Sequence, residues 1–124
     1  KFSKKVQLSK IKLLNILNEL KKRKKTVIGY GATAKAVTIL NYCNINNDLI
    51  SNFIDTTPEK INRYMPGKNI KILRYNNKIL DNYLYVFLGA WNFTKEILTK
   101  EKKFLRKGGK FITHVPLPKI FGFN

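Results

Sequence analysis

The sequence predicts an α/β fold, because segments with the period of a helix alternate with short apolar segments typical of buried strands. The 124 residues suffice for one domain with one core, and a hydrophobic fraction of 44% is ordinary for a globular protein. In such an alternation the strands pair in parallel and helices cover both faces of the sheet.

The first elements are a helix and a buried strand. Apolar side chains recur at intervals of three, at Leu8, Ile11, Leu14, Leu17 and Leu20. Ser9 is predicted to cap this helix, and the basic run 21–25 closes its end, where cations complement the helix dipole. The segment 26–30, TVIGY, is short and β-branched, which indicates a buried strand.

A second helix follows from Thr33, with apolar residues at helical spacing as far as Cys43. LISNFID (49–55) predicts the second strand. Thr57 before Pro58 is a helix-start pair, Pro66-Gly67 is a turn, and NIKIL (69–73) is a third strand.

YLYVFLGAW (83–91), aromatic and branched throughout, is the clearest strand pattern of the chain. Asn92 is predicted to cap the next helix, which ends at Gly108-Gly109. KFITHV (110–115) is a last strand and 116–124 a tail. With right-handed crossovers, these elements predict a Rossmann-like three-layer domain: a mostly parallel sheet of about four or five strands, preceded by an N-terminal helix.

Charge is strongly unbalanced, with 25 Lys and Arg against seven Asp and Glu and a formal net charge of +18. Such a field attracts polyanions, so nucleic acid has to be considered as a partner. Only four of the basic residues are Arg, the residue that recognises bases and phosphates through paired hydrogen bonds. We therefore interpret the lysines as a solvated surface and do not expect nucleic acid as a partner.

Cysteine usage and hydropathy exclude further classes. The single cysteine, Cys43, cannot form an internal disulfide or a cysteine-based zinc site, and we expect it to be a small buried residue. No segment approaches the about 20 apolar residues of a membrane helix, and no signal-peptide pattern is present, so we expect a cytoplasmic protein without a membrane partner. A start at Lys1, without methionine, predicts a processed chain or a piece of a longer one.

The main candidate site lies in VIGYGATAKAV. Gly29, Gly31 and Ala34 fit the pattern G-x-G-x-x-A, in which Gly31 lets the backbone approach a phosphate at the helix start. Asp55 follows Gly31 by 24 residues, near the distance at which a carboxylate meets a ribose hydroxyl in NAD sites. Lys35 could pair with a phosphate or simply be exposed. A tight turn with a strand-end aspartate explains the pattern equally well, so both interpretations stay open.

Residues suited to acid–base chemistry are few. His114 is the only histidine and is expected at the core or edge of the last strand. The seven carboxylates form no convincing pair, so we predict no catalytic residue and no metal site. Tyr30, Trp91 and Asn92 can each reach a ligand or act locally, by packing or as a helix cap.

Four stretches occur in the order found in one family: GYGATAKAVTILNYCNI, IDTTPEKINRYMPGKNIKI, LGAWNFTKEI and RKGGKFITHVPLP. From Leu13 to Pro118 the chain resembles the C-terminal domain of S-adenosylmethionine-dependent sugar C-methyltransferases, which methylate a carbon of nucleotide-linked deoxysugars. It departs from the family pattern at Thr33, where proline is common, and at Ala36, where glycine is common.

The resemblance implies that residues 1–124 are a single Rossmann-like domain, a fragment of a longer multidomain enzyme that is inactive alone. The domain itself is expected to bind no cofactor, with S-adenosylmethionine and zinc held by the missing domains. The implied partners are a nucleotide-diphosphate sugar and the methyl-donor-binding domain of the same parent chain. The substrate-binding residues are then expected to be Gly29, Tyr30, Gly31, Ala32, Thr33, Lys35, Asp55, Lys60, Trp91 and Asn92.

We therefore expect a domain that binds a nucleotide-linked sugar and positions it for methyl transfer by a neighbouring domain. The helix start after Gly31, with Lys35, would hold the pyrophosphate, while Asp55, Trp91 and Asn92 would position the nucleoside or sugar. Two alternatives remain: a free-standing dinucleotide (NAD-type) binding module, and nonspecific binding of nucleic acid through the net charge.

Overall fold

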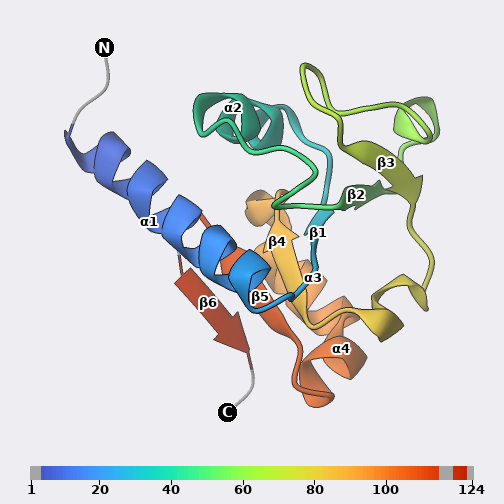
Figure 1. Cartoon of the computed structure of the whole chain (residues 1–124). Coiled ribbons are helices and arrows are strands. Elements are labelled where there is room, and N and C mark those ends of the chain that lie inside the picture. Colours follow the sequence, from blue (N-terminus) through green and yellow to red (C-terminus); the bar gives the residue numbers. More distant parts are fainter. Residues whose placement is uncertain (1–3, 115–118, 123–124) are drawn as a thin grey trace.

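The computed structural model describes residues 4–114 and 119–122, which form an α/β fold around one six-stranded sheet (Figure 1). The elements in chain order are α1 (Lys4–Lys22), β1 (Val27–Tyr30), α2 (Ala34–Tyr42), β2 (Asn52–Asp55), β3 (Lys71–Arg74), β4 (Tyr85–Leu88), α3 (Thr94–Lys100), α4 (Lys102–Arg106), β5 (Lys110–Thr113) and β6 (Lys119–Gly122). Short 3₁₀ turns lie in the connections: η1 (Pro58–Lys60), η2 (Ile79–Asn82) and η3 (Trp91–Phe93). The predicted α/β class is confirmed.

The strand order is β3-β2-β1-β4-β5-β6, and the first five strands of this order are parallel. From β1 the chain runs outward to β3 and then crosses back to β4, so the direction of winding reverses between β1 and β4. In doubly wound sheets a ligand crevice lies outside the carboxyl ends of the strands at this point. The topology therefore indicates where a site should be sought.

Side chains that alternate along the strands divide the core into two layers. On one face Phe53 and Phe87 meet edge to face, with ring centroids 6.2 Å apart, and pack beneath α1 and α2. On the other face Ile54 and Val86 pack with the side chains of α3 and α4. Burying a side chain of this size contributes about 1.5–3 kcal/mol, so the two layers hold the sheet between the helix pairs seen in Figure 1.

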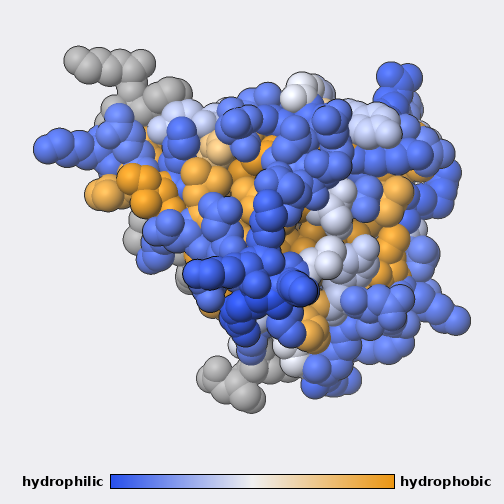
Figure 2. All heavy atoms as spheres, viewed as in Figure 1, coloured by the Kyte–Doolittle hydropathy of each residue, from blue (hydrophilic) through white to orange (hydrophobic). Residues whose placement is uncertain are grey.

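Helix α1 spans Lys4–Lys22, so Ser9 lies inside it and the predicted cap is wrong. The predicted apolar stripe is also only partly buried, since Leu8 and Ile11 are 65% and 54% exposed. A spacing of three drifts around a helix of 3.6 residues per turn, whereas the buried positions follow steps of four and three. The buried side chains of α1 are Leu13, Leu17 and Leu20. Figure 2 shows hydrophobic side chains gathered along α1 on a face that is otherwise mostly hydrophilic.

The predicted C-terminal tail contains a strand. Residues 119–122 pair antiparallel with β5, with Phe111 opposite Phe121 and their rings stacked at 6.0 Å. The rest of that segment, 116–118 and 123–124, lies outside the described residues, as does the end of the predicted strand 110–115. Two smaller predictions are confirmed: Cys43 is buried, and α4 gives way to Gly108, whose φ is +98°.

Candidate functional site

A cleft of ≈ 410 Å³ lies at the carboxyl ends of the parallel strands. It is bounded by the residues that end β1 and β2, by Tyr75 after β3, and by Ala90 after β4. Helix α3 forms the remaining wall. The lining residues are Tyr30, Gly31, Thr33, Ile54, Asp55, Thr56, Thr57, Lys60, Tyr75, Ala90, Phe93, Glu96, Ile97 and Lys100. This is the position at which doubly wound sheets bind their ligands.

The glycine turn forms the centre of the cleft. Gly31 has φ of +93°, in the left-handed region that favours glycine, and its N–H donates to the carbonyl of Ile54 at 2.9 Å. A Cβ on Gly31 would lie 2.5 Å from the Cβ of Ala90, so a side chain here would also collide with the loop after β4. The glycine therefore allows both the turn and the close approach of the two loops.

Thr33 links this turn to the start of α2. Its Oγ1 accepts the N–H of Ala36 at 3.2 Å as the helix N-cap and donates to the carbonyl of Gly89 at 2.9 Å. The N–H groups of Ala34 and Lys35, in the first turn of α2, have no acceptor within their own helix. Two backbone donors at the start of the helix are therefore left to solvent or to a ligand.

The carboxylate of Asp55 accepts hydrogen bonds from the backbone of the glycine turn and of the loop after β2. Its Oδ2 accepts the N–H of Ala32 at 2.8 Å, and its Oδ1 accepts the N–H of Thr57 at 2.9 Å. Lys60 closes the arrangement, because its Nζ donates to the carbonyl of Ala32 at 2.8 Å. Burial alone would raise the pKa of Asp55, but the hydrogen bonds from Thr57 and Ala32, together with the Lys60 ammonium, outweigh burial and lower it. The carboxylate is charged at neutral pH and holds the turn in place.

Beneath the cleft, Tyr30 and Tyr75 both donate their hydroxyls to Oε2 of Glu101, each at 2.7 Å. Glu101 is buried, at 7% exposure. Burial, followed by the hydrogen bond to Glu101, raises the pKa of Tyr75 to about 12, and the same causes raise the pKa of Tyr30 further. Both tyrosines therefore remain protonated donors at neutral pH.

The structure brings five of the ten expected substrate-binding residues together in the cleft lining, namely Tyr30, Gly31, Thr33, Asp55 and Lys60. The other five lie elsewhere. Gly29 is buried in β1 beneath the ring of Phe53, and a Cβ on Gly29 would lie only 2.5 Å from that ring. Ala32 contributes its backbone to the Asp55 and Lys60 contacts. Lys35 is exposed on α2 and does not line the cleft.

Trp91 and Asn92 stand in η3, beside the cleft rather than in its lining. Trp91 is partly buried and packs against both core layers. The predicted cap at Asn92 is wrong, because Phe93 precedes α3 and no side chain caps that helix. Phe93, in contrast, lines the cleft and is 58% exposed.

Four cleft residues stand out that were not among the expected substrate-binding residues: Tyr75, Phe93, Glu96 and Lys100. The Nζ of Lys100 lies 3.9 Å from the ring centroid of Tyr75, a cation–π contact at the mouth of the cleft. A strand-end aromatic after β3 and the first helix after β4 both belong to the carboxyl edge of the sheet. This rule of position was the one signal that could have found them.

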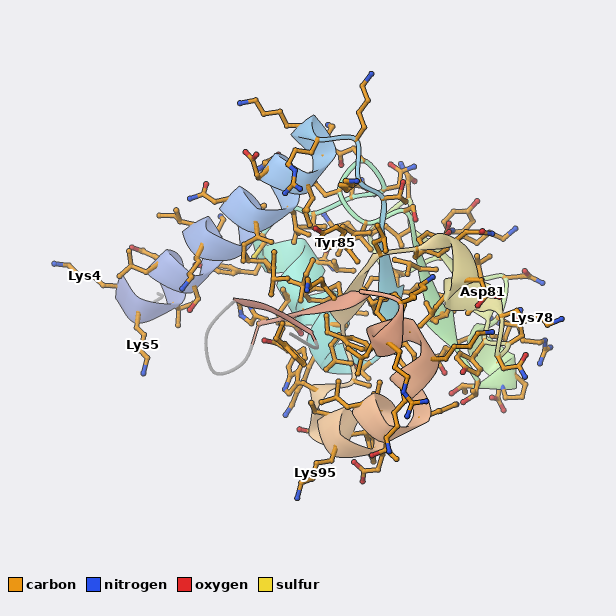
Figure 3. All side chains as sticks on the ribbon, turned by 90° about the horizontal axis from the view of Figure 1, so that it is seen from below. Lys4, Lys5, Lys78, Asp81, Tyr85 and Lys95 are labelled. Atoms are coloured by element: carbon orange, nitrogen blue, oxygen red, sulfur yellow. The ribbon has the colours of Figure 1, made fainter. Side chains whose placement is uncertain are left out.

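Lysine side chains project from several sides of the surface outside the cleft. Figure 3 shows Lys4 and Lys5 pointing away from the start of α1 at the left, Lys95 from α3 at the bottom, and Lys78 at the right. Within residues 4–114 and 119–122, no three His, Cys, Asp or Glu side chains come together as a metal site. None of the helices in these ranges is long and apolar enough to cross a membrane.

The fold is a Rossmann-like α/β domain with a cleft at the carboxyl ends of its parallel strands, and comparison with known proteins identifies its family. A family model described as the C-methyltransferase C-terminal domain matches residues 1–116. The chain belongs to this family of C-methyltransferase domains. It is also similar to the C-methyltransferase NovU of Streptomyces niveus, with 38% identity over 96 residues, which make up 77% of this chain and 23% of that protein. The chain thus spans about a quarter of that relative's length.

Proposed function

We propose that this chain is the domain of an S-adenosylmethionine-dependent C-methyltransferase that binds a nucleotide-linked sugar and holds it toward the methyl-donor-binding domain of the same parent chain. One observation carries the proposal: a cleft of ≈ 410 Å³ at the carboxyl ends of the strands combines exposed aromatic surface with lysine ammonium groups. Such a combination suits a ligand with flat rings and a pyrophosphate.

The pyrophosphate is assigned to the two sides of the cleft mouth. On one side, α2 begins next to the lining residue Thr33 with N–H groups that have no acceptor in the helix, and the exposed Lys35, which does not itself line the cleft, lies in the same turn. On the other side is Lys100, whose ammonium rests on the Tyr75 ring. The N–H of Ala32 is already taken by Asp55, so the phosphate is assigned to the donors that follow it rather than to the turn itself.

The nucleoside or sugar is assigned to the aromatic wall. Phe93 and Tyr75 present ring surface to the cleft, and Trp91 and Asn92 precede Phe93 in η3. Catalysis by this domain is then catalysis by placement: the domain fixes the reacting carbon relative to groups that the rest of the enzyme supplies. We propose that the methyl donor and the zinc of the parent enzyme are bound in its other domains.

A thermal-shift screen of the full-length protein tests the proposal. The panel contains nucleotide-diphosphate sugars, S-adenosylmethionine, NAD and NADP. Stabilisation by nucleotide-diphosphate sugars supports the proposal. Stabilisation by NAD alone favours a dinucleotide-binding module, for which the G-x-G-x-x-A turn with Gly31 at positive φ is the supporting observation. Binding of nucleic acid that weakens steeply with salt, without any response to small ligands, would instead favour the net-charge alternative.

Calorimetry on single variants locates the phosphate. Lys35→Ala and Lys100→Ala each remove one charge-assisted contact and are expected to weaken binding of the sugar nucleotide by about 1.5–3 kcal/mol. Lys12→Ala, on an exposed position of α1, is the matched control and should leave the affinity unchanged. Unchanged affinity in either test variant removes that lysine from the site.

A further inference from the structure

A buried carboxylate joins two tyrosines from distant parts of the chain under the floor of the cleft. Tyr30 ends β1, Tyr75 follows β3, and Glu101 lies between α3 and α4. Both hydroxyls reach the same oxygen, Oε2, at 2.7 Å, and the two rings lie 5.8 Å apart. The cluster therefore connects three elements that border the cleft.

The position of Glu101 follows from a break in the helix. Helix α3 ends at Lys100 and α4 begins at Lys102, and at the break Glu101 has φ of −101° and ψ of 33°. Its neighbours in sequence are exposed lysines, whereas Glu101 itself is 7% exposed. A carboxylate placed in a core costs stability unless it is hydrogen-bonded, and the two phenol donors supply that bonding.

These hydrogen bonds determine which part of each tyrosine side chain is available to a ligand in the cleft. The hydroxyl protons of Tyr30 and Tyr75 are directed at Glu101, while both residues line the cleft. The Tyr75 ring in turn carries the ammonium of Lys100, at 3.9 Å from its centroid. Lys100 is exposed and its side chain turns about four rotatable bonds, so the Tyr75 ring is the contact that keeps its charge at the mouth of the cleft.

We propose that Glu101 is a positioning residue for ligand binding: it fixes Tyr30 and Tyr75 as the floor of the cleft and, through the Tyr75 ring, sets the Lys100 ammonium where a phosphate would bind. This inference rests on the proposed function. It assigns a role in binding to a buried residue that does not itself line the cleft.

The test uses the full-length protein with Glu101→Gln, Tyr75→Phe and the double variant. Glu19→Gln, an exposed carboxylate on α1, is the control for loss of a negative charge. The first readout needs no ligand: the ring carbons of ¹³C-labelled tyrosine are followed by NMR from neutral pH to about pH 11, with Tyr75→Phe giving the assignment. In the parent, Tyr75 should stay protonated over this range. In Glu101→Gln its titration should begin at a lower pH, and in Glu19→Gln it should not change.

The second readout is affinity for the panel of nucleotide-diphosphate sugars. Glu101→Gln and Tyr75→Phe are each expected to weaken binding roughly three- to tenfold, the equivalent of one ordinary hydrogen bond, and the double variant should lose no more than either single one. In methyl transfer the loss should raise KM and leave kcat unchanged, because the reacting groups are not altered.

The outcomes separate this inference from the proposed function. If the unsubstituted full-length protein binds a sugar nucleotide and the Glu101→Gln variant binds it equally well, the positioning role of Glu101 is overturned and the proposed function stands. Additive losses in the double variant also overturn it, because the two residues would then act independently. If the parent binds no member of the panel, both proposals fall. Should Glu101→Gln not fold, Tyr75→Phe decides alone, and unchanged affinity in that variant overturns the inference.

Discussion

Replacing Asp55 with asparagine perturbs the group that holds the glycine turn. The carboxylate accepts the N–H of Ala32 at 2.8 Å and that of Thr57 at 2.9 Å, one on each oxygen. Asparagine keeps one acceptor oxygen and places an NH₂ group against the other N–H. Loss of one hydrogen bond to a charged group costs about 1.5–3 kcal/mol. The nearby Lys60 loses an attraction worth under about 1 kcal/mol, because both groups are partly exposed.

The variant should therefore be less stable by about 2–3 kcal/mol at pH 7, a fall in Tm of roughly 6–12 °C for a domain of this size. The assay is denaturant unfolding of parent and variant across acidic and neutral pH. The folded pKa of Asp55 lies below its unfolded value, so its contribution is fully present above about pH 4 and is lost as pH falls through the folded pKa. The difference between the two proteins should shrink accordingly in acid.

Asp48→Asn is the matched control. Asp48 contacts Lys21 at 3.2 Å, but the two side chains are 55% and 54% exposed, so the loss should stay within about 1 kcal/mol. Equal stability of Asp55→Asn and the parent at pH 7 would refute the role assigned to the carboxylate. So would a difference that persists unchanged in acid, because it would not depend on the charge of Asp55.

Three further predictions concern the turn and the buried polar groups. Gly31→Ala should destabilise the fold more than Gly108→Ala, although both glycines have positive φ. A Cβ at Gly31 would lie 2.5 Å from the Cβ of Ala90, whereas nothing lies within 4 Å of a Cβ at Gly108. The additional loss of stability should be about 1–3 kcal/mol in denaturant unfolding, and equal losses in the two variants would contradict this. Burial lowers the pKa of His114, so NMR should show its imidazole titrating below about pH 6.5. Its contribution to the free energy of unfolding should be present above that pH and lost as the pH falls. A titration midpoint at or above the ordinary value would contradict this. Burial raises the pKa of the Cys43 thiol, so thiol reagents should react with it only when the native state opens. The rate of modification should therefore rise with denaturant concentration. Immediate modification of the native protein would contradict the burial of Cys43.

The alternation of helix-like and strand-like segments predicted the α/β class, because the hydrophobic periodicity of each helix and strand is visible within its own stretch of sequence. Long-range pairing is what the sequence could not supply. The segment 119–122 becomes an edge strand only because β5 is already in place beside it. The N-terminal helix shows the same limit: Leu8 and Ile11 continue an apolar pattern but remain exposed, since burial depends on which side of the helix meets the sheet.

The candidate site divides in the same way. The glycine spacing located the turn, because a positive φ at Gly31 is a local requirement. The role of Asp55 depends on a contact with a residue 23 positions away, and the sequence left it open between a ribose ligand and a structural anion. Glu101 gave no signal at all. It lies within a lysine-rich stretch that resembles a solvated helix face, and its contact with Tyr30 spans 71 residues.

Hydrogen–deuterium exchange of the full-length enzyme, with and without a nucleotide-diphosphate sugar, tests whether the substrate binds in this domain. Binding in the cleft should slow exchange of the backbone amides in the glycine turn around Gly31 to Lys35 and in the segment from Ala90 to Phe93, while the exposed start of α1 exchanges at the same rate. Protection confined to other domains of the enzyme, with these two segments unchanged, would contradict the assignment of substrate binding to this domain.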